Sequence, residues 1–379
     1  MPKIRCVGSG HSWSPLFADD GAWLIDTSDM KDIIWNASEN PIQVTIGPGV
    51  TSGELATYMD SSGRGKRRGH FLSSDVVLED VTYGGTINTA CHGTGKTQTL
   101  PDYVMSTRIV KWDGTVVKLI RAEDPDAFKV NVLHFGLLGV TVDFTLQLDK
   151  DNHAISVTDY KVKTKDLFLE HGQLPASGGR KPLLERWNST FGIEIFYFAA
   201  SSLDITNWSS REFEDQDWKT DDDICAVKIF NRTKNLVGEV AKIGSEPLLV
   251  ALYSKMAAKA FEPVGKETGE VSYETSLAQA IHWQKYITDG FPVSDTEVCI
   301  KCDPDFTSAY KAIHAGIDIT KKFAKDRDSL PLNVAMEMRF TKHSDSPLSP
   351  AYGKEDGTPA ALPHWAKWSE AYVVDADKK

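Results

Sequence analysis

The sequence has few cysteines, no long apolar run and no excess of positive charge, and each shortage excludes a class of protein. Its five cysteines in 379 residues are too few and too scattered for a disulfide framework. No apolar run of about 18 residues occurs, so no transmembrane helix is expected, and the first residues do not begin a signal peptide. The net charge of -11 would repel a polyanion, so we expect no nucleic-acid partner.

Two of the cysteines, Cys299 and Cys302, have the CxxC spacing found in some zinc sites. A tetrahedral zinc site needs a second pair of ligands at matching spacing, and the sequence has none. We therefore predict no metal site. We interpret both cysteines as strand residues whose side chains point to one side.

The composition is that of an ordinary globular protein, with 41% hydrophobic and 25% charged residues. The first 150 residues contain short candidate strands between glycine-rich turns, such as 3–7, 23–25 and 43–46. After residue 151 the pattern changes to longer polar stretches, aromatic-rich strands such as 193–199, and helical patterns at 277–286 and 306–323. The length and this change predict two domains.

Helical signals are few in the first half. Thr51 and Glu54 have the spacing of a capping box, followed by apolar residues at helical spacing and ended by Gly63. Asp124 followed by Pro125 predicts the start of a short helix.

Two further patterns in the first half predict strands. Asp113-Gly114 is typical of a two-residue hairpin turn joining strands 106–112 and 115–120. The segment 139–148 alternates as a strand does. Its apolar residues are expected to share one face: Val140, Val142, Phe144, Leu146 and Leu148.

The densest chemical signal is the loop Gly8-Ser9-Gly10-His11-Ser12, which follows the first candidate strand. Its glycines let several backbone N–H groups converge on one point, which suits a pyrophosphate. A Rossmann fingerprint would need a third glycine where Trp13 stands. Taken alone, the loop is equally well explained as a tight surface turn.

A second loop, from Gly84 to Gly95, again gathers small residues and hydroxyls around one histidine, His92. Its end resembles a P-loop, but that motif needs a glycine where Ala90 stands. The backbone is expected to approach another group closely here. The alternative is a glycine-rich turn between strands.

Two downstream segments add charge. In the predicted strand 337–341, Glu337, Arg339 and Thr341 share one face, and an ion-paired solvent-exposed face is the alternative explanation. The segment from His364 to Lys367 has a capped surface turn as its alternative.

Together these four segments resemble the FAD-dependent aldonolactone oxidases, the L-gulonolactone and D-arabinono-1,4-lactone oxidases, with alditol oxidases as relatives. The resemblance implies an α+β fold. An FAD-binding domain of the vanillyl-alcohol-oxidase (PCMH) type would span 1–150, and an α+β substrate (cap) domain with a mostly antiparallel sheet would span 151–379. The family normally has segments before the first matching loop, before residue 364 and after the last match, so the resemblance implies a chain shortened there.

The resemblance also implies a covalent bond between FAD and His11. It places the remaining FAD-binding residues in the two loops and in the strand that closes the domain. These residues are Gly8, Ser9, Gly10, Ser12, Gly84, Gly85, Asn88, Thr89, His92, Gly93, Thr94, Gly139 and Val140.

Oxidation of a secondary alcohol moves a hydride to the flavin and releases a hydroxyl proton, so it needs a base and a positive charge. The resemblance gives the first role to Glu337 and the second to Arg339 and Lys367, with His364 binding substrate. It implies a small sugar lactone or polyol as substrate, and oxygen or another compound as electron acceptor. An alditol or oligosaccharide oxidase and a noncatalytic flavin-binding or sugar-binding relative remain alternatives.

Overall fold

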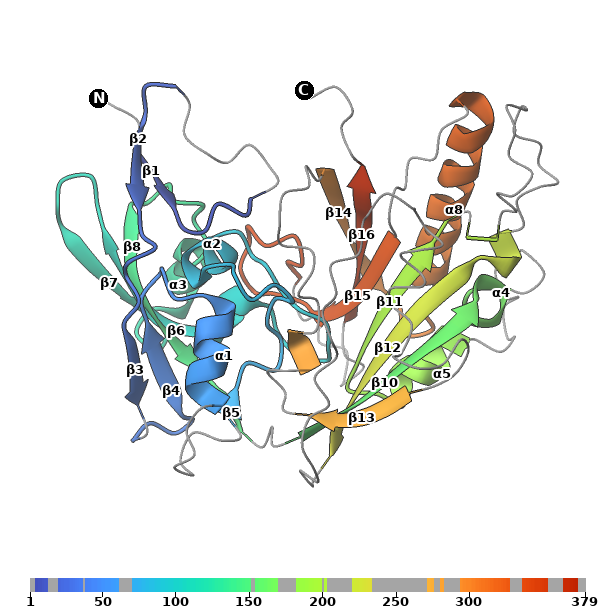
Figure 1. Cartoon of the computed structure of the whole chain (residues 1–379). Helices are drawn as coiled ribbons and strands as arrows, with labels where there is room; N and C mark the ends of the chain where they lie inside the picture. The colour runs from blue at the N-terminus through green and yellow to red at the C-terminus, as the bar shows by residue number, and fades with distance from the viewer. Residues whose placement is uncertain are drawn as a thin grey trace.

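The structure is a computed structural model with two large sheets side by side (Figure 1), and the described residues form two further sheets of two strands each. It describes residues 4–12, 20–36, 38–60, 70–150, 154–169, 182–199, 201–202, 220–233, 271–275, 280–282, 294–327, 336–353 and 364–373. The first half contains a five-stranded sheet of order β3-β4-β8-β6-β7, and the second half a seven-stranded sheet of order β13-β10-β12-β11-β15-β16-β14. The mixed α+β class is confirmed.

The first half, residues 4–150, alternates short strands with short helices. Its elements are β1 (Ile4–Val7), β2 (Trp23–Asp26), β3 (Ile33–Asn36), β4 (Gln43–Ile46), α1 (Ser52–Asp60), β5 (His70–Phe71), α2 (Tyr83–Asn88), a 3-10 helix (Leu100–Tyr103), β6 (Val104–Val110), β7 (Val116–Ile120), α3 (Pro125–Asn131), β8 (Val140–Gln147) and β9 (Asp149–Lys150).

The second half is built on the larger sheet. Its elements are β10 (Ala154–Lys163), α4 (Thr164–Leu167), α5 (Pro182–Asn188), β11 (Gly192–Phe198), a 3-10 helix (Thr220–Asp222), β12 (Ile224–Thr233), β13 (Val271–Thr275), β14 (Ser294–Cys302), α8 (Thr307–Arg327), β15 (Met336–Lys342) and β16 (His364–Val373). Each pair of neighbouring strands described in this sheet is antiparallel, as predicted.

Both predicted helix starts are confirmed. Thr51 Oγ1 accepts from the backbone N–H of Glu54 at 3.1 Å, while the Glu54 carboxylate accepts from the backbone N–H of Thr51 at 2.9 Å. This reciprocal pair satisfies two N–H groups at the start of α1. Asp124 caps α3 by accepting from the backbone N–H of Ala127 at 3.0 Å. The predicted end of α1 at Gly63 lies outside the described residues.

The hairpin between β6 and β7 exists, but the predicted two-residue turn is wrong. Lys111 N–H donates to Thr115 O at 2.9 Å, and Gly114 N–H donates to Lys111 O at 3.0 Å, which leaves three residues in the loop. A two-residue turn of the predicted kind needs positive φ at both central residues. Only Gly114, at φ 82°, has it.

The predicted face of β8 is also only partly right. Phe144, Leu146 and Leu148 are buried, but in the first part of the strand Thr141 is the buried residue and Val142 is only half-buried. The register between β6 and β8 shifts at this point. A β-bulge inserts one residue and therefore reverses the alternation of the residues before it.

The prediction that Cys299 and Cys302 point to one side is wrong, because residues three apart in a strand lie on opposite faces. Cys302 is buried among the apolar residues that pack against α8. The pairing of β14 with β16 and of β16 with β15 puts Cys299 on the face that carries Arg339.

The larger sheet has one apolar and one charged face. Met336, Met338 and Phe340 alternate along β15 into a core formed with helices α4, α5 and α8. Figure 1 shows these helices on the side of the sheet away from the first half. The opposite face of the sheet turns toward the first half, and Phe230 of β12 packs into that half's core.

Trp13 and most of the predicted helix at 277–286 lie outside the described residues. The helix predicted at 306–323 is confirmed by α8. Among the described helices, none is both long enough and apolar enough to cross a membrane.

Candidate active site

The two glycine-rich loops lie side by side, as a shared ligand site requires. A Cβ on Gly8 would collide with the Thr82 side chain, so the first loop passes directly over the residue that precedes α2. Gly84 and Gly85 form the first turn of that helix. Gly10 has φ 73°, and a Cβ there would meet nothing within 4 Å, so space is open on that side of the loop.

Helix α2 has polar atoms that fit a polar ligand. Asn88 Nδ2 donates to Gly84 O at 3.0 Å, and the Thr89 hydroxyl donates to Gly85 O at 2.9 Å. In the part of the chain that the structure describes, the buried atoms Asn88 Oδ1 and Thr86 Oγ1 have no hydrogen-bond partner. Buried polar atoms are rarely left unsatisfied, so both fit contacts with a bound cofactor.

The strand predicted to close the flavin domain reaches the same helix. Gly139 packs against the backbone of Val110, and the residue after Val140, Thr141, lies 3.4 Å from Asn88 Nδ2 through its hydroxyl. His134 Nε2 lies 3.2 Å from the same hydroxyl. Burial lowers the pKa of His134 to about 4, so its imidazole is neutral at neutral pH.

The loop 92–95 is hydrogen-bonded into the larger sheet. Thr94 Oγ1 donates to Ile193 O of β11 at 2.7 Å, and Gly95 N–H donates to Phe340 O of β15 at 2.7 Å. The loop therefore lies between these two strands just beyond their last paired residues. A predicted flavin-binding loop and the predicted catalytic strand are in direct contact.

His92 joins this loop to the charged face of the sheet. Its Nδ1 lies 2.6 Å from Gly93 O, and its Nε2 lies 3.2 Å from Glu297 Oε1 of β14. Arg339 Nη1 donates to the backbone oxygen of His92 at 3.3 Å. Both ring nitrogens of His92 have protein partners.

The strand register aligns five polar residues across the larger sheet. Arg339 stands opposite Glu194 on one side and Lys367 on the other. Glu194 in turn stands opposite Lys228, and Lys367 opposite Cys299. Residues directly opposite in neighbouring strands share a face. Arg339 and Lys367 therefore belong to one row, and Glu337 lies two residues away in the next row of the same face. His364 stands three residues from Lys367, opposite Lys342 and Cys302, so the register puts it on the other face.

Glu337 and Arg339 form a close ion pair on this face, with 3.1 Å between Glu337 Oε1 and Arg339 Nε. Their side chains are 14% and 16% exposed, so the pair is largely shielded from water. Glu194 is 1% exposed and lies diagonally across from Glu337 on the same face of the sheet. Burial and then the Glu337 charge raise the pKa of Glu194 well above its usual range, against the opposing charges of Arg339 and Lys228.

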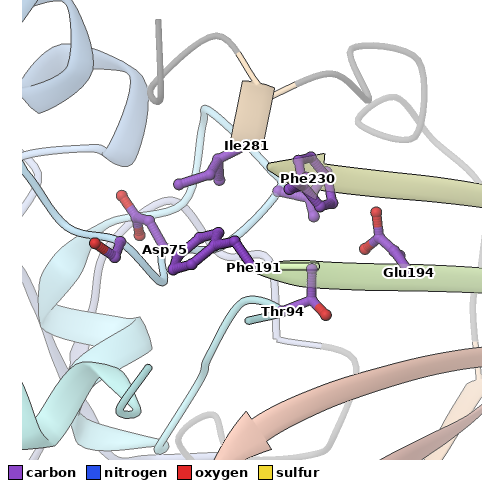
Figure 2. A pocket seen from close by; sticks show the side chains of 8 residues that line it. Asp75, Thr94, Phe191, Glu194, Phe230 and Ile281 are labelled. Atoms are coloured by element: carbon purple, nitrogen blue, oxygen red, sulfur yellow. The ribbon is translucent and has the colours of Figure 1, made fainter. Parts of the chain in front are cut away.

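A pocket opens where the two halves meet, and Figure 2 shows Phe191 between Asp75 on one side and Glu194 on the other. Thr94 from the flavin loop also lines it. The Asp75 carboxylate is fully buried and accepts from the hydroxyl of Tyr83 at 2.6 Å. Its backbone oxygen is so close to Gly93 that no Cβ fits at that glycine.

Four residues of this site were not predicted from the sequence: Glu194, Lys228, Asp75 and Glu297. Glu194 and Lys228 had a signal, since Glu194 is the single charge of β11 and Lys228 stands in the apolar first part of β12. Such a charge is rarely buried without a partner. Asp75 and Glu297 had no comparable signal, because their partners come from distant segments.

Comparison with known proteins agrees with this geometry. The family profile described as FAD binding domain matches residues 2–120. L-gulonolactone oxidase of Mus musculus is 31% identical over 157 residues, which are 41% of this chain and 34% of that protein. The chain has a FAD-binding domain and is a distant homologue of the L-gulonolactone oxidases and dehydrogenases and of the D-arabinono-1,4-lactone oxidases.

A bacterial relative aligns over most of the chain. L-gulono-1,4-lactone dehydrogenase of Mycobacterium tuberculosis is 25% identical over 359 residues, covering 93% of this chain and 72% of that protein. The match to the mouse enzyme spans only about a third of that enzyme's length. Among solved structures, cholesterol oxidase of Brevibacterium sterolicum superimposes with a TM-score of 0.68 at 14% identity, covering 99% of this chain and 73% of that one. This likeness shows a shared fold.

Proposed function

We propose that this protein oxidises a CH–OH group of a sugar-1,4-lactone of the L-gulono or D-arabinono type, using FAD. The observation that carries the proposal is the direct contact between the loop 92–95 and the strand with Glu337 and Arg339. This contact supports a cofactor and a charged substrate site next to each other. Oxygen or another electron acceptor completes the reaction.

The flavin part comprises residues 1–150 and the substrate part residues 151–379. FAD, when bound, accepts the hydride that leaves the substrate carbon. The residues that would hold it are Gly8, Ser9, Gly10, Ser12, Gly84, Gly85, Asn88, Thr89, His92, Gly93, Thr94, Gly139 and Val140. The crowded glycines and the unsatisfied atoms of Thr86 and Asn88 support this set.

His11 would carry the covalent bond to the flavin. It lies in the open loop that passes Thr82, whereas both ring nitrogens of His92 already have partners. His11→Ala protein should release its flavin on acid precipitation, while the wild-type precipitate stays yellow. Mass mapping of the flavin to a peptide containing His92 would contradict this assignment.

The side chains of the charged face would perform the proton chemistry. The Glu337 carboxylate accepts the proton of the substrate hydroxyl. Arg339 donates two parallel hydrogen bonds toward a lactone oxygen and balances the negative charge that develops there. Lys367, opposite Arg339 in register, adds a second positive charge. His364, predicted to bind the substrate, belongs by register to the other face and takes no part in this proton chemistry.

A substrate panel tests the proposal. Purified protein would be assayed with L-gulono-, L-galactono- and D-arabinono-1,4-lactones, alditols and oligosaccharides, following hydrogen peroxide and, in parallel, reduction of an artificial acceptor dye. We expect a lactone to give the highest turnover. Higher turnover with an alditol or an oligosaccharide would show that the proposed substrate class is wrong. Absence of turnover by flavin-loaded protein would favour a noncatalytic role in flavin or sugar binding.

A further inference from the structure

His92 of the flavin loop has a hydrogen-bond acceptor beside each of its ring nitrogens. Nδ1 lies 2.6 Å from the backbone oxygen of Gly93, and Nε2 lies 3.2 Å from Glu297 Oε1 of β14. A backbone carbonyl and an ionised carboxylate only accept hydrogen bonds, and a neutral imidazole has a single N–H. Both contacts can be hydrogen bonds at the same time only when each nitrogen carries a proton. The geometry therefore requires an imidazolium cation.

Glu297 supplies the opposite charge. Its side chain is 28% exposed, so it remains in contact with water, and an ordinary glutamate is ionised at neutral pH. The side chain of His92 is only 2% exposed. A buried charge needs a partner that offsets its loss of hydration, and the Glu297 carboxylate is such a partner in direct contact with the ring.

The other charged groups around the flavin loop come from three strands of the larger sheet and from the loop before α2. They are Glu194, Glu337, Arg339, Lys367 and Asp75. Arg339 Nη1 donates to the backbone oxygen of His92 at 3.3 Å, but its guanidinium is paired with Glu337. The two cations of this set are matched by carboxylates, so the direct contact with Glu297 decides the charge of the ring.

The protonated ring also fixes the orientation of the next peptide group. Because a trans peptide is planar, the Thr94 N–H points away from the Gly93 oxygen that His92 holds. The Gly93 N–H donates to Ser74 Oγ at 3.1 Å, which anchors the loop from another side. In the part of the chain that the structure describes, the Thr94 N–H has no acceptor. It is therefore a backbone donor that a ligand of the flavin loop can use.

We infer that Glu297 is a positioning residue that acts through His92. It keeps His92 as an imidazolium whose two N–H groups tie β14 to the flavin loop and hold the Thr94 N–H toward the bound cofactor. When the ring loses a proton, one of these two hydrogen bonds is lost and the peptide is no longer fixed. The effect on turnover rests on the proposed function, whereas the charge of His92 is a property of this chain and does not depend on the substrate.

Nitrogen-15 NMR of the FAD-loaded full chain, labelled at histidine, tests the charge directly, with the His92 signals identified by their loss in His92→Gln. At about pH 7 both ring nitrogens of wild-type His92 should carry protons. Glu297→Gln keeps an acceptor oxygen but removes the charge, so the pH at which the ring is half deprotonated should fall by about one pH unit or more. A neutral His92 in the wild type, or an unchanged titration in Glu297→Gln, would overturn the inference.

Asp318→Asn is the matched control, because Asp318 lies 3.0 Å from His314 on α8. It removes the same kind of contact from a helix on the other face of the sheet, and it should leave the His92 titration unchanged.

The pH dependence of turnover tests the positioning role. Wild-type turnover should fall at alkaline pH as His92 loses its proton, and in Glu297→Gln this fall should begin about one pH unit lower. Asp318→Asn should follow the wild type. Coinciding alkaline limbs in wild type and Glu297→Gln would contradict the positioning role. A wild type with a doubly protonated His92 but without lactone turnover would refute the proposed function and leave the charge of His92 supported.

Discussion

The two halves of the molecule build their parts of the site by different means. In the flavin half the recognition groups are backbone atoms and small side chains, held in loops where Gly8, Gly84 and Gly93 allow segments to touch. In the substrate half they are long charged side chains whose neighbours are set by strand register, as for Glu194 and Arg339. Substitutions in the flavin half should therefore lower mainly the flavin content, and substitutions in the substrate half should lower mainly turnover.

The largest separable effect is expected at Arg339. Arg339→Lys keeps the positive charge but loses the planar fork that contacts Glu337 and the backbone of His92. Turnover on the preferred lactone should fall by roughly 100 to 1,000-fold, the usual cost of one oriented charge-stabilising donor. Flavin absorbance per protein should change little.

Arg108→Lys provides the matched control for this experiment. Arg108 pairs with Asp143 on the flavin half, and its side chain is 51% exposed, so the same chemical change should alter neither turnover nor flavin content. Turnover by Arg339→Lys equal to that of the control would place Arg339 outside the site.

A backbone change in the flavin half should have the opposite signature. In Gly93→Ala the new Cβ would collide with the backbone oxygen of Asp75, so the loop must shift. We expect destabilisation by about 1–3 kcal/mol and flavin content lowered several-fold. Absorbance after purification and chemical denaturation measure the two effects.

Gly114→Ala serves as the control for Gly93→Ala. The substitution likewise adds one Cβ to a glycine, but Gly114 lies in an exposed hairpin where this Cβ meets nothing within 4 Å. Its φ of 82° makes alanine cost about 1 kcal/mol without touching the flavin. Equal flavin loss in both variants would show that flavin binding does not depend on the close contact between Gly93 and the backbone of Asp75.

The junction between the halves should respond to pH. Burial and the neighbouring carboxyl group of Asp345 raise the pKa of Asp102 to about 6, although Thr99 and Ser344 donate to it. Between about pH 4 and 6 the folded protein therefore binds more protons than the unfolded chain. The free energy of unfolding should fall as pH rises through this range, by on the order of 2 kcal/mol.

Asp102→Asn should remove most of that slope. Denaturant titrations at several pH values between about 4 and 7 measure it for both proteins. If the free energy of unfolding depended on pH equally in wild type and variant, Asp102 would have an ordinary pKa and would not be protonated in this range.

The smallest effect is expected far from the junction. Thr51→Ala removes one half of the capping box of α1 and should cost about 1 kcal/mol of stability. Flavin content and turnover should stay at wild-type values, measured beside the other variants. A loss of turnover in Thr51→Ala would contradict the expectation that a change in stability far from the site leaves turnover unaffected.

The sequence by itself determined the local features. The capping box at Thr51, the Asp124 cap and the alternation of Met336, Met338 and Phe340 all follow from contacts within a few residues. The resemblance of the glycine-rich loops to a flavin-binding family could also be recognised from short sequence segments, because close backbone approach requires glycine at fixed positions. These features supplied the fold class and the candidate list.

Tertiary structure alone decided the partners. The placement of Glu194 opposite Arg339, the contact of His92 with Glu297 and the bulge that turns Thr141 inward depend on which strands pair and in what register. A shift of one residue moves every side chain of a strand to the other face, so short-range sequence patterns cannot fix such contacts. Burial of Glu194 likewise arises only when segments distant in the sequence pack together, and burial is the largest cause of its raised pKa.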